Sequence, residues 1–423
     1  MLGLLVTIVF AANAQQKPVV TNDSLAASIA KINKTLQAFE RIKFSGYIQA
    51  QYQIADTLGA KCYNGGDFAT NSAQRFMVRR GYFKVSYTGN LANYVLQLNV
   101  TEKGVNIRDA YFVMKDPWLK AFSLTGGVFY RPFGYELSYS AALRETPELG
   151  RVTQVLMPGE RDLGASLSFQ MPQSSKWHPI SLEAGLFAGN GPTAETDDKL
   201  DFIGRLGYAD SFKKNKLSFG LGVSYYNGSI YQAKKDVYEM ADLGGIQAFN
   251  QLQADTLIGS YFKREYIGFD AQFAVKTLIG TTTLRGDFVM GTQPGSDKSS
   301  VSPVAAVDYS LYLRKFSGYV LYFVQSIPKT TSSIVIRYDY YDPNTTVKKD
   351  EIGLAVQPVR TKATNGTDIA YTTWGFGWFA DFSSHLRCTL YYDLVKNEIS
   401  KNLKDYNRDL KDNVFTVRVQ YKF

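Results

Sequence analysis

Cysteine and histidine are the scarcest side chains in this sequence, with two of each among 423 residues. Two cysteines cannot form a disulfide framework, and we expect Cys62 and Cys388 to be free thiols. His178 is expected in a short turn and His385 at the start of a strand, so neither lies beside a serine in the way that hydrolysis requires. No His/Cys cluster suggests zinc or iron. We therefore expect no enzyme activity, no metal and no cofactor.

Long apolar runs and blocks of positive charge are missing as well. No internal stretch approaches the roughly 18 apolar residues of a transmembrane helix. The formal net charge of +9 is spread along the chain instead of forming a Lys/Arg block, so we expect no nucleic-acid partner. The sequence also lacks the glycine patterns of nucleotide-binding loops. The modest positive excess favours small anions as partners.

The first residues, MLGLLVTIVFAANA, are an apolar stretch that ends in A-x-A. This pattern predicts a secretory signal peptide over residues 1–14. Residues 15–42 are then a periplasmic segment. Within it, apolar residues recur at helical spacing between Leu25 and Phe39, which predicts an amphipathic helix over residues 24–41. Such a helix could trimerise, pack under a larger domain or enter its mouth.

Aromatic side chains are abundant, with 29 Tyr and 27 Phe, and from Phe44 onward the periodicity is that of strands. In the last ten residues, VFTVRVQYKF, apolar and polar residues alternate, which gives a strand long enough to cross a bilayer. Sixteen strands are predicted in all: 44–53, 76–88, 92–101, 105–115, 121–131, 162–170, 180–189, 201–209, 216–227, 264–275, 281–292, 316–326, 332–341, 370–380, 385–395 and 414–423.

The connections between these segments alternate between short turns and long loops in seven of eight cases. An even number of strands with this asymmetry is typical of bacterial outer-membrane barrels. We therefore predict an all-β fold, a 16-stranded antiparallel transmembrane β-barrel over residues 43–423, with a short N-terminal periplasmic helix. The last strand should close the barrel against the first. In RFMVRRGYFKVSY, strict alternation directs Arg80 and Lys84 inward and Arg79 toward lipid.

Two runs around the third outer loop are more specific than alternation: GGVFYRPFGYELSYS (126–140) and PGERDLGASLSF (158–169). They resemble the phosphate-selective porin O/P family of bacterial outer-membrane porins. The matching positions are Gly127, Phe129, Arg131, Pro132, Phe133, Glu136, Gly159, Arg161, Asp162 and Gly164. The resemblance implies sixteen strands, a homotrimer and a third outer loop folded into the lumen. A terminal aromatic such as Phe423 is, in outer-membrane barrels, what the barrel assembly machinery recognises.

Charged residues in this loop and on the inner wall are the candidate solute pathway. The candidates are Arg131, Arg144, Arg151, Arg161 and Glu136 in or beside the loop, and Arg80, Lys84 and Arg337 on the wall. A ring of arginines can replace part of an anion's hydration shell. The same arginines could instead fasten the loop to the wall, and we expect Arg161 with Asp162, and Arg285 with Asp287, to be structural pairs.

These observations predict an outer-membrane porin for passive diffusion of small hydrophilic solutes, with a preference for anions and phosphate as a candidate. Two alternatives stay open. One is a non-channel barrel that acts as a surface receptor or secretion component, and the other is a barrel-embedded hydrolase.

Overall fold

The computed structural model describes residues 22–423 apart from 213–215, 234–235, 253–256, 258 and 358. The predicted signal peptide lies outside the described residues. Residues 1–43 and 44–423 form two separate compact units. The described part of the first is helix α1 (Asn22–Glu40), as the apolar spacing predicted, and its Ile29, Ile32, Leu36 and Phe39 are exposed. No helix in the described residues is both long and apolar enough to span a bilayer.

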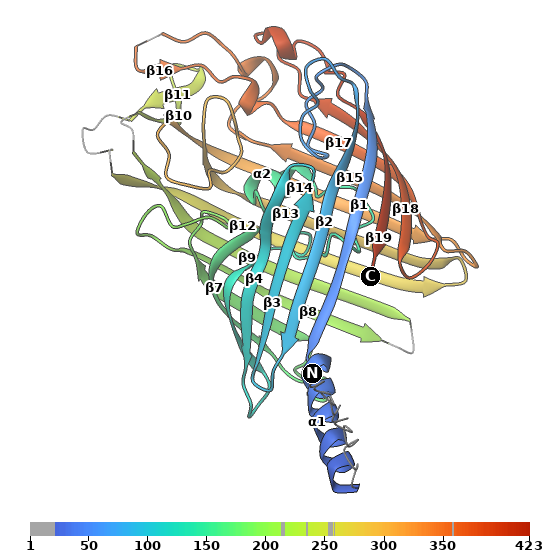
Figure 1. Ribbon diagram of the computed structural model, residues 1–423. Coiled ribbons are helices and arrows are strands. Elements are labelled where there is room, and N and C mark those ends of the chain that lie inside the picture. Colours follow the sequence, from blue (N-terminus) through green and yellow to red (C-terminus); the bar gives the residue numbers. More distant parts are fainter. Residues whose placement is uncertain (1–21, 213–215, 234–235, 253–256, 258, 358) are drawn as a thin grey trace, which may run out of the picture. The chain divides into compact units, whose positions relative to one another are not determined.

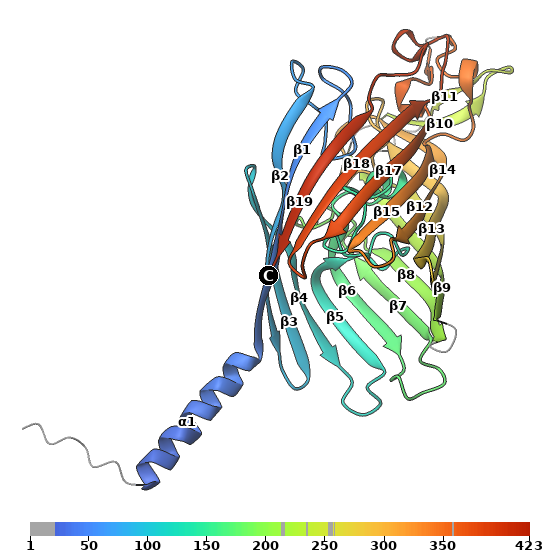
Figure 2. The ribbon, with the colours of Figure 1, turned by 90° about the vertical axis from the view of Figure 1, so that its right-hand side faces the viewer.

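The second unit is a closed antiparallel β-barrel. Its first and last strands, β1 and β19, pair with Ile48 opposite Tyr421, and Figure 2 shows them side by side. Each of the sixteen predicted segments coincides with one strand, so the predicted fold is confirmed. The barrel strands are β1 (Ile42–Ala55), β2 (Gln74–Thr88), β3 (Ala92–Thr101), β4 (Gly104–Lys115), β5 (Phe122–Tyr130), β6 (Arg161–Gln170), β7 (Ile180–Phe187), β8 (Asp201–Phe212), β9 (Leu217–Gln232), β12 (Ser260–Thr277), β13 (Gly280–Gly295), β14 (Leu311–Ser326), β15 (Ser332–Asp342), β17 (Tyr371–Asp381), β18 (Leu386–Asn397) and β19 (Val414–Lys422).

Short turns join the strands at one end of the barrel and long loops join them at the other (Figure 1). The fully described turns are 89–91, 116–121, 171–179, 278–279, 327–331 and 382–385, and the fully described loops include 56–73, 131–160, 188–200, 296–310 and 398–413. One connection at the outer end is short, the one between β3 and β4. It is a tight hairpin, because Thr101 pairs with Gly104.

The long outer loops contain secondary structure of their own. Three short strands, β10 (Val237–Asp242), β11 (Gln247–Gln251) and β16 (Thr361–Lys362), pair with one another across two of the loops. Single-turn helices lie at Lys349–Glu351, Gly366–Asp368 and Lys404–Tyr406. The loops therefore form a structured rim around the outer mouth.

The two faces of the wall differ as a bilayer requires. Inward positions near the seam are polar and buried, as in Gln49, Gln51, Thr416 and Arg418. The outward positions carry exposed aliphatic and aromatic side chains: Leu96, Leu124, Leu167, Leu206, Leu221, Phe269, Leu284, Leu321, Ile336, Phe376, Leu390 and Val419. Cys62 and Cys388 are both free thiols, as predicted.

Candidate functional site: the lumen and its third outer loop

Residues 131–160, called loop 3 here, connect β5 to β6 and fold into the barrel, where they form the short helix α2 (Arg151–Leu156; Figure 1). Val152, Val155 and Leu156 of α2 are almost fully buried. They pack in one cluster with inward-facing wall residues: Ile203, Tyr226, Tyr266, Val289, Phe316 and Tyr341. Burying one such aliphatic side chain contributes about 1.5–3 kcal/mol. The expectation that loop 3 narrows the lumen is therefore confirmed, and an apolar patch of the wall holds it there.

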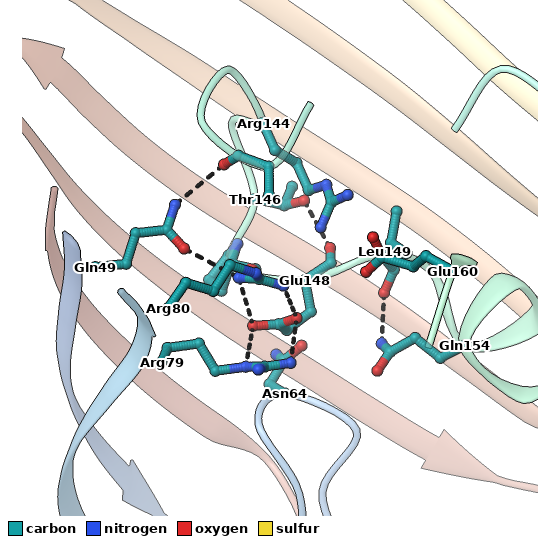
Figure 3. A network of polar contacts seen from close by, with 12 residues as sticks. Gln49, Asn64, Arg79, Arg80, Arg144, Thr146, Glu148, Leu149, Gln154 and Glu160 are labelled. Carbon is teal, nitrogen blue, oxygen red and sulfur yellow. Dashed lines mark hydrogen bonds and ion pairs between the residues drawn. The ribbon is translucent and has the colours of Figure 1, made fainter. Parts of the chain in front are cut away.

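Glu148 of loop 3 is bound by three arginines of the wall (Figure 3 shows two of them). Arg79 Nε lies 2.8 Å from Glu148 Oε1, Arg80 Nη2 lies 2.6 Å from Oε2, and Arg418 Nη2 lies 3.1 Å from Oε1. Burial alone would raise the pKa of Glu148, but the three guanidiniums hold it well below its ordinary value. Glu148 is thus a permanent anion that ties the loop to β2 and β19.

The position of Arg79 corrects the prediction that it faces lipid. Upstream of it, Arg75 and Met77 face inward, since their side chains contact the buried Gln53 and Gln51 of β1. Arg79 continues that inward row, yet the next residue, Arg80, is also inward and 2 % exposed. The alternation therefore reverses between Arg79 and Arg80, as it does at a β-bulge. This irregularity brings two adjacent guanidiniums to one carboxylate.

Glu136 and Asp287 fix the backbone of loop 3. Glu136 accepts the N–H of Gly150 at 2.7 Å, at the start of α2, and also the hydroxyls of Thr153 and Tyr322. Asp287 of β13 accepts the N–H groups of Tyr135, at 2.7 Å, and Glu136, at 3.1 Å. Both carboxylates are buried and satisfy backbone donors inside the barrel.

The expected pair of Arg285 with Asp287 does not form, because the two side chains serve different parts of loop 3. Asp287 is occupied by backbone N–H groups, whereas both terminal nitrogens of Arg285 bind the carboxylate of Glu145. A spacing of two residues places both side chains on one face, but it does not make them partners.

Arg131 and Arg161 are paired and buried, each with 2 % of its surface exposed. Arg131 Nε lies 2.9 Å from Asp162, and Arg161 lies 3.1 Å from Asp109 and 2.6 Å from Glu160. The predicted pair of Arg161 with Asp162 is therefore wrong. The carboxylate of Asp162, in β6, binds Arg131 instead. Arg131 is the first residue after β5, the strand that pairs with β6 on this side.

Arg144 and Arg151 differ from the other candidate arginines, because neither has a carboxylate within ion-pair distance among the described residues. Arg144 is 6 % exposed, donates only to the carbonyl of Tyr139 at 3.2 Å, and leaves Nε and Nη1 without partners. Arg151 stacks between two rings, with its guanidinium carbon 3.8 Å from the centre of Tyr371 and 4.3 Å from that of Tyr63. Arg144 and Arg151 are therefore the loop 3 arginines without a direct ion pair among the described residues.

The last two candidates lie on the wall. Arg337 binds Asp393 at 2.7 Å and Asp339 at 3.1 Å, and it donates to the carbonyl of Glu148 at 3.1 Å. Lys84 lies opposite the buried Gln97 and so faces the lumen, half-buried, with no ion pair to any described residue.

Groups suited to metal binding or hydrolysis are not assembled in the described part of the chain. No three His, Cys, Asp or Glu side chains there are grouped for a metal ion. His178 Nδ1 contacts the carbonyl of Met171, and His385 Nδ1 that of Lys422. The absence of catalysis stays a prediction.

The closed sixteen-stranded barrel, apolar outside and narrowed inside by its third loop, has the porin fold, and the protein belongs to the outer membrane of a Gram-negative bacterium. It is similar to OprB of Pseudomonas putida, with a TM-score of 0.59, 12 % identity, and 92 % of this chain and 96 % of that chain covered. It is also similar to the outer-membrane channel DcaP of Acinetobacter baumannii, with a TM-score of 0.52 and 10 % identity, and to Salmonella typhi OmpF, with a TM-score of 0.51 and 11 % identity. Each of these two comparisons covers 90 % of this chain and 97 % of the other chain. At these identities the likeness establishes the fold alone. No protein-family model matches the sequence, and no curated protein matches it.

Proposed function

We propose that the barrel is a passive diffusion channel for small hydrophilic solutes and that it prefers anions. The observation that carries the preference is that Arg144 and Arg151, in the loop that narrows the lumen, form no direct ion pair with a described carboxylate. Positive charge is also in excess on the nearby wall, since the three arginines Arg79, Arg80 and Arg418 all bind the single carboxylate of Glu148. Directed guanidinium donors in a narrow passage favour a partly dehydrated anion. The resemblance to phosphate-selective porins makes phosphate one candidate solute.

Liposome swelling tests the diffusion claim. Liposomes that contain the purified protein should swell in isotonic solutions of small solutes, at a rate that falls with solute size. Swelling no faster than in protein-free liposomes contradicts the proposal. That result favours the second candidate, a receptor or secretion barrel, to which the apolar packing of α2 across the lumen is also suited.

The anion preference should increase as the pH falls from 8 to 5. Burial raises the pKa of Asp412, in the last outer loop, to about 6, against the opposing effect of Arg151, while Asp409 and Asp56 raise it further. Protonation below that pKa removes a negative charge beside Arg151. One charge 10 Å away in water is worth about 0.4 kcal/mol, so we expect a change of about twofold in the chloride-to-potassium permeability ratio. Asp412→Asn should reduce this pH dependence, and an unchanged dependence in that variant contradicts the assignment.

We further propose a homotrimer, as the family resemblance implies, and recognition of Phe423 by the barrel assembly machinery. Phe423 is exposed at the seam, where its backbone N–H donates to Gly46 at 3.0 Å. Deleting Phe423 should lower the amount of heat-modifiable barrel in outer membranes while export continues. Undiminished barrel levels contradict this role, and crosslinking in native membranes tests the trimer.

A further inference from the structure

The outer mouth contains a cavity of about 840 Å³, called the vestibule here. Residues 61–67, α2, residues 297–300, the loop before β17 and the loop after β18 contribute to its lining. Its volume is typical of small-molecule sites. Four tyrosines take part in the lining: Tyr63, Tyr341, Tyr371 and Tyr406. Aromatic rings at this density provide flat apolar faces in an otherwise polar loop region.

Arg151 is one of four cationic side chains that line the vestibule, with Lys61, Arg79 and Lys298. Lys61 is paired with Asp67 and Arg79 with Glu148. The guanidinium carbon of Arg151 lies over the rings of Tyr63 and Tyr371, at 4.3 and 3.8 Å from their centres, so cation–π contacts with two rings restrict its movement. Its Nε is buried and has no hydrogen-bond partner, and no described carboxylate forms an ion pair with it. A stacked guanidinium can donate only along its edge, which is the geometry that binds a carboxylate with two parallel bonds.

The rest of the lining mixes donors with acceptors. Lys298, Asn365 and Thr367 can donate, whereas Asp405 and Asp412 can only accept when ionised. Carboxylates repel a simple inorganic anion. A ligand that carries both carboxylate and hydroxyl groups satisfies both kinds of side chain, because each hydroxyl donates and accepts.

We propose that the vestibule binds an acidic sugar, with the carboxylate of the sugar on the edge of Arg151 and its hydroxyls on the surrounding polar side chains. The proposal rests on the channel function proposed above and adds a solute class to it. Fixing the guanidinium between two rings before binding reduces the entropy that binding costs.

Calorimetric titration of the full-length protein in detergent tests the site with digalacturonate, uncharged galactobiose and inorganic phosphate as probes. Digalacturonate should bind at least about tenfold more tightly than galactobiose, because galactobiose lacks the charge-assisted bonds to Arg151. Phosphate should bind no more tightly than galactobiose. Equal binding of both sugars, tighter binding of phosphate, or no binding of digalacturonate overturns the proposal.

Three substitutions separate the vestibule from the narrow part of the lumen. Arg151→Ala should weaken digalacturonate binding at least about tenfold. Arg144→Ala should leave it unchanged, since Arg144 does not line the vestibule. Tyr63→Leu should weaken it as well, by releasing one face of the guanidinium. Equal binding by wild type and Arg151→Ala overturns the proposal, provided that the variant keeps its heat-modifiable migration.

Reversal potentials on the same samples distinguish a failed sugar site from a failed channel. Anion selectivity without digalacturonate binding overturns only the vestibule proposal. Digalacturonate binding by a protein that conducts no current overturns the channel and leaves a binding barrel.

Discussion

Replacing Glu148 by glutamine is expected to release loop 3 and to raise the single-channel conductance severalfold. Glu148 pairs with three wall arginines, Arg79, Arg80 and Arg418, of which Arg80 and Arg418 are almost fully buried. Removing one partner of a buried ion pair typically costs about 3–5 kcal/mol, because a buried charge is left without compensation. Undocking the loop hydrates these arginines and widens the lumen. Planar-bilayer recording measures the conductance directly.

Glu145→Gln is the matched control, since Glu145 lies in the same loop and binds one arginine, Arg285. Its conductance should change less than that of Glu148→Gln. If Glu148→Gln conducts like wild type, then the apolar contacts of Val152, Val155 and Leu156 hold the loop without the carboxylate.

The barrel could be predicted from the sequence because each strand of the wall carries its own alternation of apolar and polar residues. One face of each strand meets lipid and the other the lumen, so a period of two recurs through the strands, and the turn and loop lengths then fix the topology. The three short strands of the rim escaped prediction. Their pairing depends on contacts between loops, such as Phe249 with Lys362, and not on a repeating pattern.

The sequence could predict which charged residues lie in the candidate site, but not which of them form ion pairs with one another. The resemblance indicated which loop holds Glu136, Arg144 and Arg151, and all three lie there. The partners could not be inferred, because Glu148 meets residues far away in sequence, such as Arg418. Arg79 was misplaced because a single irregularity in β2 reverses the alternation, and no residue type in RFMVRRGYFKVSY marks that point.

Replacing both Arg144 and Arg151 by alanine is expected to shift ion selectivity toward cations by about tenfold in permeability ratio. These two arginines form no direct ion pair in the described chain, so each keeps guanidinium donors that a permeating anion can use. A unit charge at 4 Å and an effective dielectric constant near 20 is worth about 4 kcal/mol. One third of that free energy is about a tenfold ratio. The reversal potential in a potassium chloride gradient measures the shift.

Arg161→Ala is the comparison variant, because Arg161 is paired with Asp109 and Glu160. Its main expected effect is on loop stability, seen as a lower temperature for the heat-modifiable gel shift. A double variant that keeps the wild-type reversal potential excludes Arg144 and Arg151 as determinants of selectivity.

This barrel is proposed to conduct small ions and to prefer anions. The most direct measurement is a planar-bilayer recording of the wild-type protein in a potassium chloride gradient. The expected result is discrete conductance steps and a reversal potential whose sign shows that chloride is more permeant than potassium. A membrane that stays silent after insertion of folded protein, or a reversal potential of the opposite sign, contradicts it.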